Sequence, residues 1–223
     1  MFKQFIKKSI HKSQHCNRNW DLSKSIPDED IDLIIESATQ CPVKQNLNLY
    51  KTHVITDRNL IEKIHSHTEG IIADGGTHKK GDPEVDVMTT NTQTLANLLL
   101  VFTKDYPRTK KTDRSGGYVG PRDDSEIDNP DAPTYIEDRI QSVGIASAYV
   151  NFTASMLGYE TGCCKCFDVE AVGKVLGTDD QEEPLLLMGV GYPDKKRSRL
   201  EHHNDSSLRF PTRKNRRTYE VHA

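Results

Sequence analysis

The sequence has few apolar and aromatic residues. Only 35% of its 223 residues are hydrophobic and 7% are aromatic, with a single tryptophan. No run approaches the roughly 20 apolar residues of a membrane-spanning helix. The first 14 residues also lack the apolar core and the cleavage site of a secretory signal. We therefore expect a domain with a polar shell, a core concentrated in a few segments, and no membrane partner.

Cysteines are few and badly spaced for disulfides. There are five, an odd number, and Cys163, Cys164 and Cys166 are too close together for an ordinary bridge among themselves. A reducing, cytoplasmic setting is expected. A zinc site formed by these cysteines with His202 and His203 is a rival interpretation. Because adjacent cysteines fit poorly around one tetrahedral ion, we expect no metal.

Charge is unevenly distributed along the chain. The net charge is -3, yet residues 195–217 carry nine Lys or Arg against only Glu201 and Asp205, whereas residues 123–138 are acidic. The basic segment is either a solvated tail or an anion-binding arm. A nucleic-acid contact is the alternative from another class of function, but the chain is acidic overall and no aromatic residues interleave the basic run. We expect no nucleic-acid partner.

One strongly apolar helix is expected to organise the chain, over residues 138–158. Its apolar residues form two stripes at helical spacing, so that little of its circumference remains for water. The helix is therefore expected to be covered by other elements or by a second copy of the chain, and to end at Gly158 in a left-handed residue. The first stripe is Ile140, Val143, Val150, Ala154 and Leu157, and the second is Ile145, Tyr149, Phe152 and Met156.

The remaining elements favour an α+β fold in one domain spanning residues 1–223. Helices and strands interleave without strict alternation, so we expect a mixed central sheet flanked by helices. Residues 104–134 lack periodicity and are expected to form a lid, and residues 193–223 a C-terminal arm. The other expected helices are residues 1–15, 28–40, 59–65, 84–95 and 169–176, and the expected strands are residues 50–56, 97–103, 161–167 and 184–190.

Four segments, in the same order along the chain, resemble the FMN-dependent nitroreductase family. The first, residues 14–21, is similar to the family's Arg-x-Ser-x-(Arg/Lys)-x-Phe stretch. The resemblance places Gln14 and Cys16, with His15 between them, at the FMN phosphate, and Arg18 at the pyrimidine edge of the flavin. A cation there stabilises the negative charge of reduced flavin. Gln14 is uncharged and Cys16 is a poorer donor than serine, so the phosphate contacts depart from the family pattern.

The second segment is residues 41–50, which resembles the family's Pro-Ser-Ser-x-Asn-x-Gln-Pro-Trp loop. In the family this loop reaches the flavin that is bound mainly by the other subunit. Pro42 and Asn46 match the pattern, whereas Val43 and Lys44 replace the two serines. Lys44 would bring a cation to the flavin in place of hydroxyl groups, or is simply a surface lysine in a turn.

The third segment, residues 157–168, resembles the stretch whose backbone lies against the flavin ring. The resemblance implies main-chain contacts from Cys163, Cys164, Lys165 and Cys166, with an amide N–H pointing at flavin N5. Since the contact uses the main chain, unusual side chains here are compatible with it.

The fourth segment, residues 213–217, resembles the C-terminal Lys-x-Arg of the family. Lys214 and Arg216 match it and would complete the phosphate site. Asn91 is a weaker candidate for a polar contact with the flavin's pyrimidine edge. No Gly-x-Gly-x-x-Gly follows a strand, so a Rossmann cofactor fold is not expected.

The resemblance implies a domain-swapped-type homodimer with FMN at the subunit interface. NADH or NADPH would reduce the flavin, which would then reduce a nitro-aromatic, quinone-like or other electron-poor acceptor in a ping-pong mechanism. No catalytic side chain is assigned; Tyr106 and Tyr118 are the aromatic candidates in the lid. Three alternatives remain: other FMN chemistry such as reductive dehalogenation or flavin breakdown, a dimeric binding protein without activity, and the nucleic-acid-binding tail.

Overall fold

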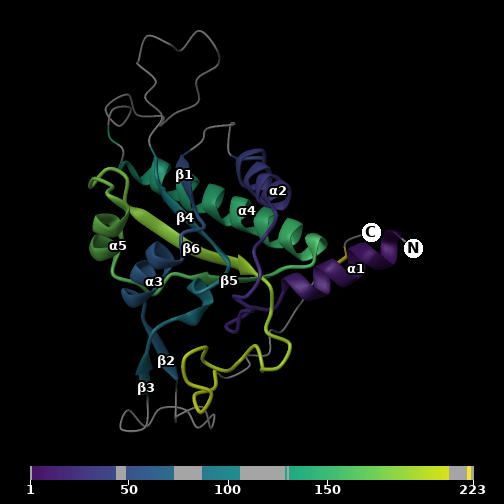
Figure 1. Ribbon diagram of the computed structural model, residues 1–223. Coiled ribbons are helices and arrows are strands. Elements are labelled where there is room, and N and C mark those ends of the chain that lie inside the picture. The colour runs from purple at the N-terminus through teal and green to yellow at the C-terminus, as the bar shows by residue number, and fades with distance from the viewer. Residues whose placement is uncertain are drawn as a thin grey trace.

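The computed structural model describes residues 2–43, 49–72, 87–105, 129, 131–210 and 220–221. Within them, a four-stranded sheet carries helices on both faces, and a separate two-stranded ribbon lies beyond it (Figure 1). The sheet order is β1 (Tyr50–Ile55), β4 (Leu98–Lys104), β6 (Pro184–Gly191) and β5 (Glu160–Cys164), and the ribbon pairs β2 (Gly70–Ile72) with β3 (Val87–Thr89). The helices are α1 (Phe2–Ser13), α2 (Asp28–Thr39), α3 (Arg58–Ser66), the 3-10 turn η3 (Thr92–Thr94), α4 (Pro133–Leu157) and α5 (Val169–Leu176).

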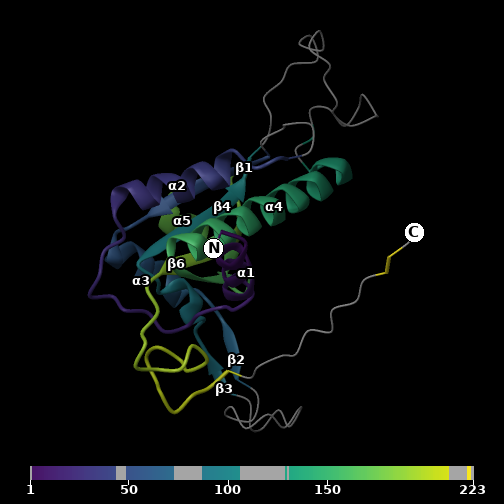
Figure 2. The ribbon, with the colours of Figure 1, turned by 90° about the vertical axis from the view of Figure 1, so that its right-hand side faces the viewer.

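Strand β4 is the centre of the fold, and all seven of its residues are buried. Leu98, Leu100 and Phe102 point into one core, with α2 and α4. Leu99 and Val101 point into a second core, with α3 and α5. Figure 2 shows α2 and α4 together on one side of the sheet. This arrangement explains the uninterrupted apolar run, because successive side chains of a strand point to opposite faces and here both faces are covered.

The ladders of this sheet are antiparallel. A parallel contact comes from the segment after α1, where Cys16 forms an isolated bridge with Thr161 at the outer edge of β5. The same segment continues to Trp20, which is buried and donates from Nε1 to the carbonyl of Thr92, 2.8 Å away. The expected mixed sheet is therefore antiparallel in its ladders and gains its parallel member only at this edge.

The structure confirms helix α4. Within one copy of the chain, one face of this helix is buried. Val143, Val150 and Ala154 pack against α2 and the sheet. Ile140, expected in that buried stripe, is instead 58% exposed, and Tyr149 from the second stripe is 46% exposed. Within one copy of the chain the described elements therefore cover α4 only in part, and its cover by a second copy stays a prediction.

The prediction of a helix over residues 84–95 is wrong. The part described contains strand β3 and then the 3-10 turn η3. The physical reason lies in the threonines and in Asn91: β-branched residues lose side-chain freedom in a helix, and the Asn91 side chain accepts from the N–H of Gln93, which starts a tight turn. Strand β2, which pairs with β3, was not expected from the sequence.

The other expected elements are confirmed within a residue or two, except that strand β5 ends at Cys164, three residues before the expected end. Asp168 caps α5 by accepting from the N–H of Ala171, and Gly158 ends α4 with a φ of 99°. Tyr106 and Tyr118, with most of the expected lid, lie outside the described residues. In the part that the structure describes, no helix combines the length and apolar character needed to cross a bilayer.

Candidate functional site

The structure brings together four of the residues expected at the flavin: Cys16, Arg18, Asn91 and Cys164. The parallel bridge to Thr161 holds the first of them beside β5. Arg18 and Asn91 both lower the pKa of the Cys164 thiol, Asn91 through a side-chain hydrogen bond and Arg18 through its charge. Two segments expected to be neighbours from the sequence, residues 14–21 and 157–168, are therefore adjacent in space.

Cys164 is a packing residue of this site. It is 1% exposed, and its Sγ donates to the carbonyl of Cys166, 3.4 Å away. Burial raises the pKa of this thiol to about 11, against the smaller opposing effects of Asn91 and Arg18. A thiol in that state is neutral near pH 7 and is not a nucleophile. The side chain thus supports the strand, as expected if the main chain is the functional part.

Arg18 is the main cation of the site. Its Cζ lies over the ring of Phe210, 4.2 Å from the ring centroid. Burial lowers its pKa, and Arg199 acts in the same direction. The Nε atom is buried and has no hydrogen-bond partner among the described residues. A buried N–H donor without a partner is uncommon in proteins, so this atom marks a place where a ligand acceptor fits.

Contacts of its main-chain N–H and carbonyl groups fix the position of Asn91. Its N–H donates to Thr68 Oγ1, 2.9 Å away, and its carbonyl lies 3.2 Å from His65 Nδ1. His65 is buried on α3 and also contacts Thr94 Oγ1 at 3.0 Å. Sequence reasoning missed His65, although its position next to Ile64 on the buried face of α3 was a usable signal.

Gly162 permits the close approach of three segments. A Cβ at this position would lie 2.8 Å from the carbonyl oxygen of Asn17 and 2.7 Å from Cβ of Gln93. Real Cβ atoms do not approach other atoms that closely, so only glycine fits between β5, η3 and the segment after α1. This requirement was also missed, since it depends on contacts between distant parts of the chain.

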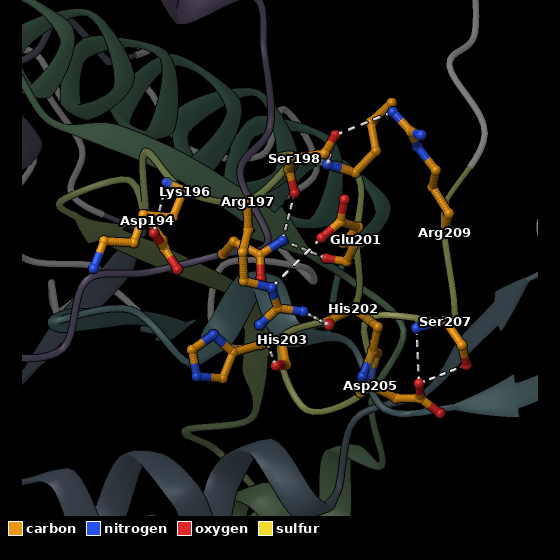
Figure 3. Close-up of polar contacts among 12 residues, drawn as sticks. Asp194, Lys196, Arg197, Ser198, Glu201, His202, His203, Asp205, Ser207 and Arg209 are labelled. Atoms are coloured by element: carbon orange, nitrogen blue, oxygen red, sulfur yellow. Dashed lines mark hydrogen bonds and ion pairs between the residues drawn. The ribbon is translucent and has the colours of Figure 1, made fainter.

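The segment from Asp194 to Phe210 reaches the site through the contact of Phe210 with Arg18, and Figure 3 shows the polar contacts within this segment. Arg197 organises it: its Nη1 and Nη2 atoms donate to the carbonyls of His203 and His202, each at 2.7 Å, and its Nε lies 3.5 Å from Glu201 Oε2. Part of the basic tail is therefore structural. Asn19 anchors this loop. Its Nδ2 donates to the carbonyls of Ser198 and Glu201, at 2.5 and 2.7 Å.

Several expected site residues are on the surface around this centre. Gln14 is exposed and donates from Nε2 to the carbonyl of His11, 2.9 Å away. The other exposed members are His15, Cys16, Pro42, Cys163, Lys165 and Cys166. In the described part, no group of three or more His, Cys, Asp or Glu side chains is arranged to hold a metal ion, so the structure gives no support to the rival zinc site.

Two of the segments expected at the flavin have no described contact with Arg18 and its neighbours. Pro42 and Val43 follow α2, and Val43 packs against the first core; no contact links them to Arg18 within the described part of a single chain. Lys44 and Asn46 lie outside the described residues, as do Lys214 and Arg216. The phosphate contacts expected from the C-terminal arm therefore stay a prediction.

Comparison with solved structures supports this fold. A nitroreductase family protein from Clostridium novyi matches with a TM-score of 0.59 and 16% identity, covering 88% of this chain and 87% of the other. A family protein from Streptococcus pneumoniae gives 0.59 and 18%, covering 89% and 93%. NfrA1 nitroreductase from B. subtilis gives 0.63 and 16%, covering 85% and 67%.

At these identities the structural matches show the fold alone. No curated protein sequence matches the chain. The sequence profile described as "Nitroreductase family" matches residues 12–192, most of the chain and all four strands of the central sheet. The chain therefore belongs to the nitroreductase family.

Proposed function

We propose that this protein is an FMN-dependent oxidoreductase that passes electrons from NADH or NADPH to an electron-poor acceptor, such as a nitro-aromatic or quinone-like compound, in a ping-pong mechanism. Family membership supports a flavin oxidoreductase in general. The observation that carries the proposal for this chain is Arg18, whose buried Nε has no partner among the described residues and whose charge acts on Cys164 of β5.

The residues present fit the ring of a flavin. Arg18 offers a positive charge and an unused donor where the reduced ring would carry negative charge. β5 is an edge strand of the sheet, and an edge strand presents main-chain N–H and C=O groups. Beyond the bridge between Cys16 and Thr161, no described strand covers that edge. Its main chain is thus available to contact the ring, as the resemblance implies for residues 163–166.

The chain's own residues would bind and orient the cofactor, and FMN would supply the hydride and electron transfers. Arg18 would stabilise the anionic reduced ring. Asn91, fixed by Thr68 and His65, would present its side chain to the pyrimidine edge. Lys214 and Arg216 would neutralise the phosphate. No side chain of the described site is proposed as an acid or base, since Cys164 holds its proton near neutral pH.

We also propose that two copies of the chain form the complete site. Ile136 and Ile140, about one helical turn apart, form an exposed apolar face on α4, at 40 and 58% exposure, and Tyr149 is 46% exposed on another side of the helix. A second copy would cover this face, and its Pro42–Asn46 loop would reach the flavin. We propose a cytoplasmic setting, supported by the five free thiols.

The test is the visible spectrum of the purified protein after addition of FMN. Bound flavin with a stoichiometry of one per chain, bleached by NADH or NADPH and restored by an acceptor, is the expected result. Protein that stays colourless and takes up no FMN would instead favour the dimeric binding protein without activity. Product analysis with halogenated aromatic compounds and with free flavin separates the proposal from dehalogenation and flavin breakdown.

A further inference from the structure

The loop from Asp194 to Phe210, here called the arm loop, is attached to the rest of the chain by a small number of side chains. All of its residues are described, and none belongs to a helix or to a strand of either sheet. Segments of this kind open at a lower free energy than the sheet beside them. The side chains that hold the arm loop therefore decide whether it can open while the core stays folded.

His202 is the buried contact of the arm loop. Its side chain belongs to a residue that is only 4% exposed. The Nε2 atom lies 2.9 Å from Oγ1 of Thr89 on β3, and the ring stacks on Phe210. Phe210 in turn stacks on the guanidinium of Arg18. One imidazole ring thus connects the ribbon to the aromatic residue that positions Arg18.

The second nitrogen of this ring has no partner. Nδ1 of His202 is buried and forms no hydrogen bond with any described residue. A neutral imidazole carries one N–H, whereas an imidazolium carries N–H groups on both nitrogens. Protonation of His202 would therefore bury a charged donor without an acceptor, which is strongly unfavourable. The closed arm loop fits His202 only as a neutral ring.

His203 repeats this arrangement. Its Nδ1 is also buried and lacks a hydrogen-bond partner in the part of the chain that the structure describes. Figure 3 shows both histidines beside Arg197, which donates to their two carbonyls. Neither ring forms an ion pair with a described carboxylate. His53 is different, since its Nε2 lies 2.8 Å from Oε1 of Glu182 and that contact favours a protonated ring.

The groups around His202 favour its neutral form. Burial is the main cause that lowers its pKa, and the charge of Arg197 acts in the same direction. A hydrogen bond with the main chain of Thr90 and the charge of Asp205 oppose these effects without reversing them. From α3, a charge on His65 would repel one on His202.

The groups around His203 act in the same way. Burial is again the main cause that lowers the pKa of this ring. The charges that add to burial come from the arm loop and from α3, and they are Arg197, Arg58 and His202, whereas Asp194 opposes them. His65 on α3 is coupled to this ring as well. Both histidines of the arm loop are therefore held in a setting that excludes protons.

We propose that His202 and His203 form a pH switch: as neutral rings they keep the arm loop closed, and as cations they release it and withdraw Phe210 from Arg18. The switch itself does not require flavin. Its consequence for the reaction rests on the proposed function, because Arg18 without Phe210 would lose its position at the flavin in mildly acidic solution.

The direction of the pH effect follows from the difference between the closed and open loop. An open, solvated histidine has a pKa of about 6.5, and the closed loop disfavours the proton. The closed form thus has its full stability above about pH 6.5 and loses stability as the pH falls below that value. A histidine that binds a proton only in the open loop lowers the protection of the loop about tenfold between about pH 7.5 and pH 5.5.

Hydrogen exchange of the full-length protein without added flavin, followed by mass spectrometry, tests the switch. Protection factors, corrected for the intrinsic exchange rate at each pH, are compared for peptides from the arm loop and from β4. We expect arm-loop protection to fall about tenfold or more between about pH 7.5 and pH 5.5. At the lower pH it should remain at least about tenfold below that of β4, because the loop opens without the sheet.

The double variant His202→Gln/His203→Gln isolates the two rings, since glutamine keeps a side-chain N–H and does not titrate in this range. Its arm-loop protection should change less than about threefold over the same pH range. His53→Gln is the control and should show the fall of the parent protein. If the double variant does not fold by circular dichroism, the two single variants should each remove part of the fall.

Three results would overturn the proposal. The first is arm-loop protection in the parent protein that does not depend on pH, and the second is an unchanged fall in the variants that lack these histidines. The third is equal protection of the arm loop and β4 at the lower pH, which would mean that the whole domain unfolds together. FMN uptake at pH 7.5 tests the proposed function separately, so either proposal can fail without the other.

Discussion

The guanidinium of Arg18 and the ring of Phe210 are stacked, with Cζ 4.2 Å from the ring centroid. The contact joins the segment after α1 to the loop that Asp194 to Phe210 form in the C-terminal arm. Phe210 is buried and packs in turn on the ring of His202, with centroids 6.4 Å apart. The cation proposed to face the flavin is therefore positioned by residues almost two hundred positions away in the sequence.

Replacing Arg18 with alanine should weaken FMN binding by about 10- to 100-fold, because a hydrogen bond to a charged group contributes about 1.5 to 3 kcal/mol. Titration of flavin fluorescence measures this. Arg209→Gln is the matched control: it removes an exposed arginine of the same loop, which bonds Ser198 Oγ at 3.3 Å. Unchanged affinity and reduction rate in Arg18→Ala would refute the proposed role of Arg18.

Phe210→Leu should retain the fold and lower FMN affinity less than Arg18→Ala does. The substitution removes a cation–π contact of about 0.5 to 2 kcal/mol while keeping an apolar side chain in place. Phe210→Tyr keeps the aromatic ring and should restore the affinity. If leucine and tyrosine behave alike, the ring does not position Arg18.

Asn19→Ala should lower the free energy of unfolding by about 2 kcal/mol, since it deletes two hydrogen bonds to the loop carbonyls. Urea denaturation followed by circular dichroism measures the change. Asn59→Ala, at an exposed position of α3, is the control and should change stability by less than about 0.5 kcal/mol. Equal effects of the two substitutions would contradict the anchoring role of Asn19.

His65 should make the fold sensitive to acid. Its pKa is lowered from 6.5 to about 4: burial is the main cause, the carbonyl of Asn91 opposes it, and the charges of His202, Arg58 and His203 act in the same direction as burial. The unfolded chain therefore binds more protons than the folded chain between about pH 6.5 and pH 4, so stability falls as the pH drops through that range. The loss approaches about 3 kcal/mol.

Urea midpoints measured between pH 7.5 and pH 4 test this expectation. His65→Gln should flatten the dependence in that window, at a cost in stability that is already present at pH 7.5. His11→Gln, on the exposed side of α1, should leave the slope as in the parent protein. A parent-like slope in His65→Gln would mean that other groups cause the acid sensitivity.

Ile140→Glu should convert the proposed homodimer to a monomer that binds little FMN, because it places a charge in the exposed apolar face that Ile140 forms with Ile136 on α4. Light scattering coupled to size-exclusion chromatography gives the mass. Ile71→Glu is a closely matched control, since Ile71 on β2 has the same 58% exposure but lies in the separate ribbon. A monomeric parent protein would remove the basis of the two-copy proposal.

The elements predicted correctly are those whose signal is local. β4 is read from its own apolar run, and α5 from Asp168 at its start and Gly177 after its end. The helix over 84–95 was wrong because apolar spacing ignored the side-chain cap made by Asn91. For α4, spacing showed two apolar stripes but not which one the chain itself covers.

The residues of the candidate site also divide into those with a local sequence signal and those without one. Arg18, Asn91 and Cys164 were found through motifs, and the structure places them together. Asn19, His65, Gly162 and Phe210 were missed because each acts through a contact with a segment far away in sequence. In the sequence, Asn19 is one polar residue within a polar stretch. Its role depends on the carbonyls of Ser198 and Glu201, which only the folded chain brings to it.

The attachment of α1 has a practical consequence. Ser155 and Asn151 of α4 donate to the main-chain carbonyls of Ser9 and Ser13, so the outward-facing side chains of α1 take no part in these bonds. Dyes or affinity handles attached at Lys3 or Lys7, both exposed, should report on this protein without disturbing how its first helix is seated.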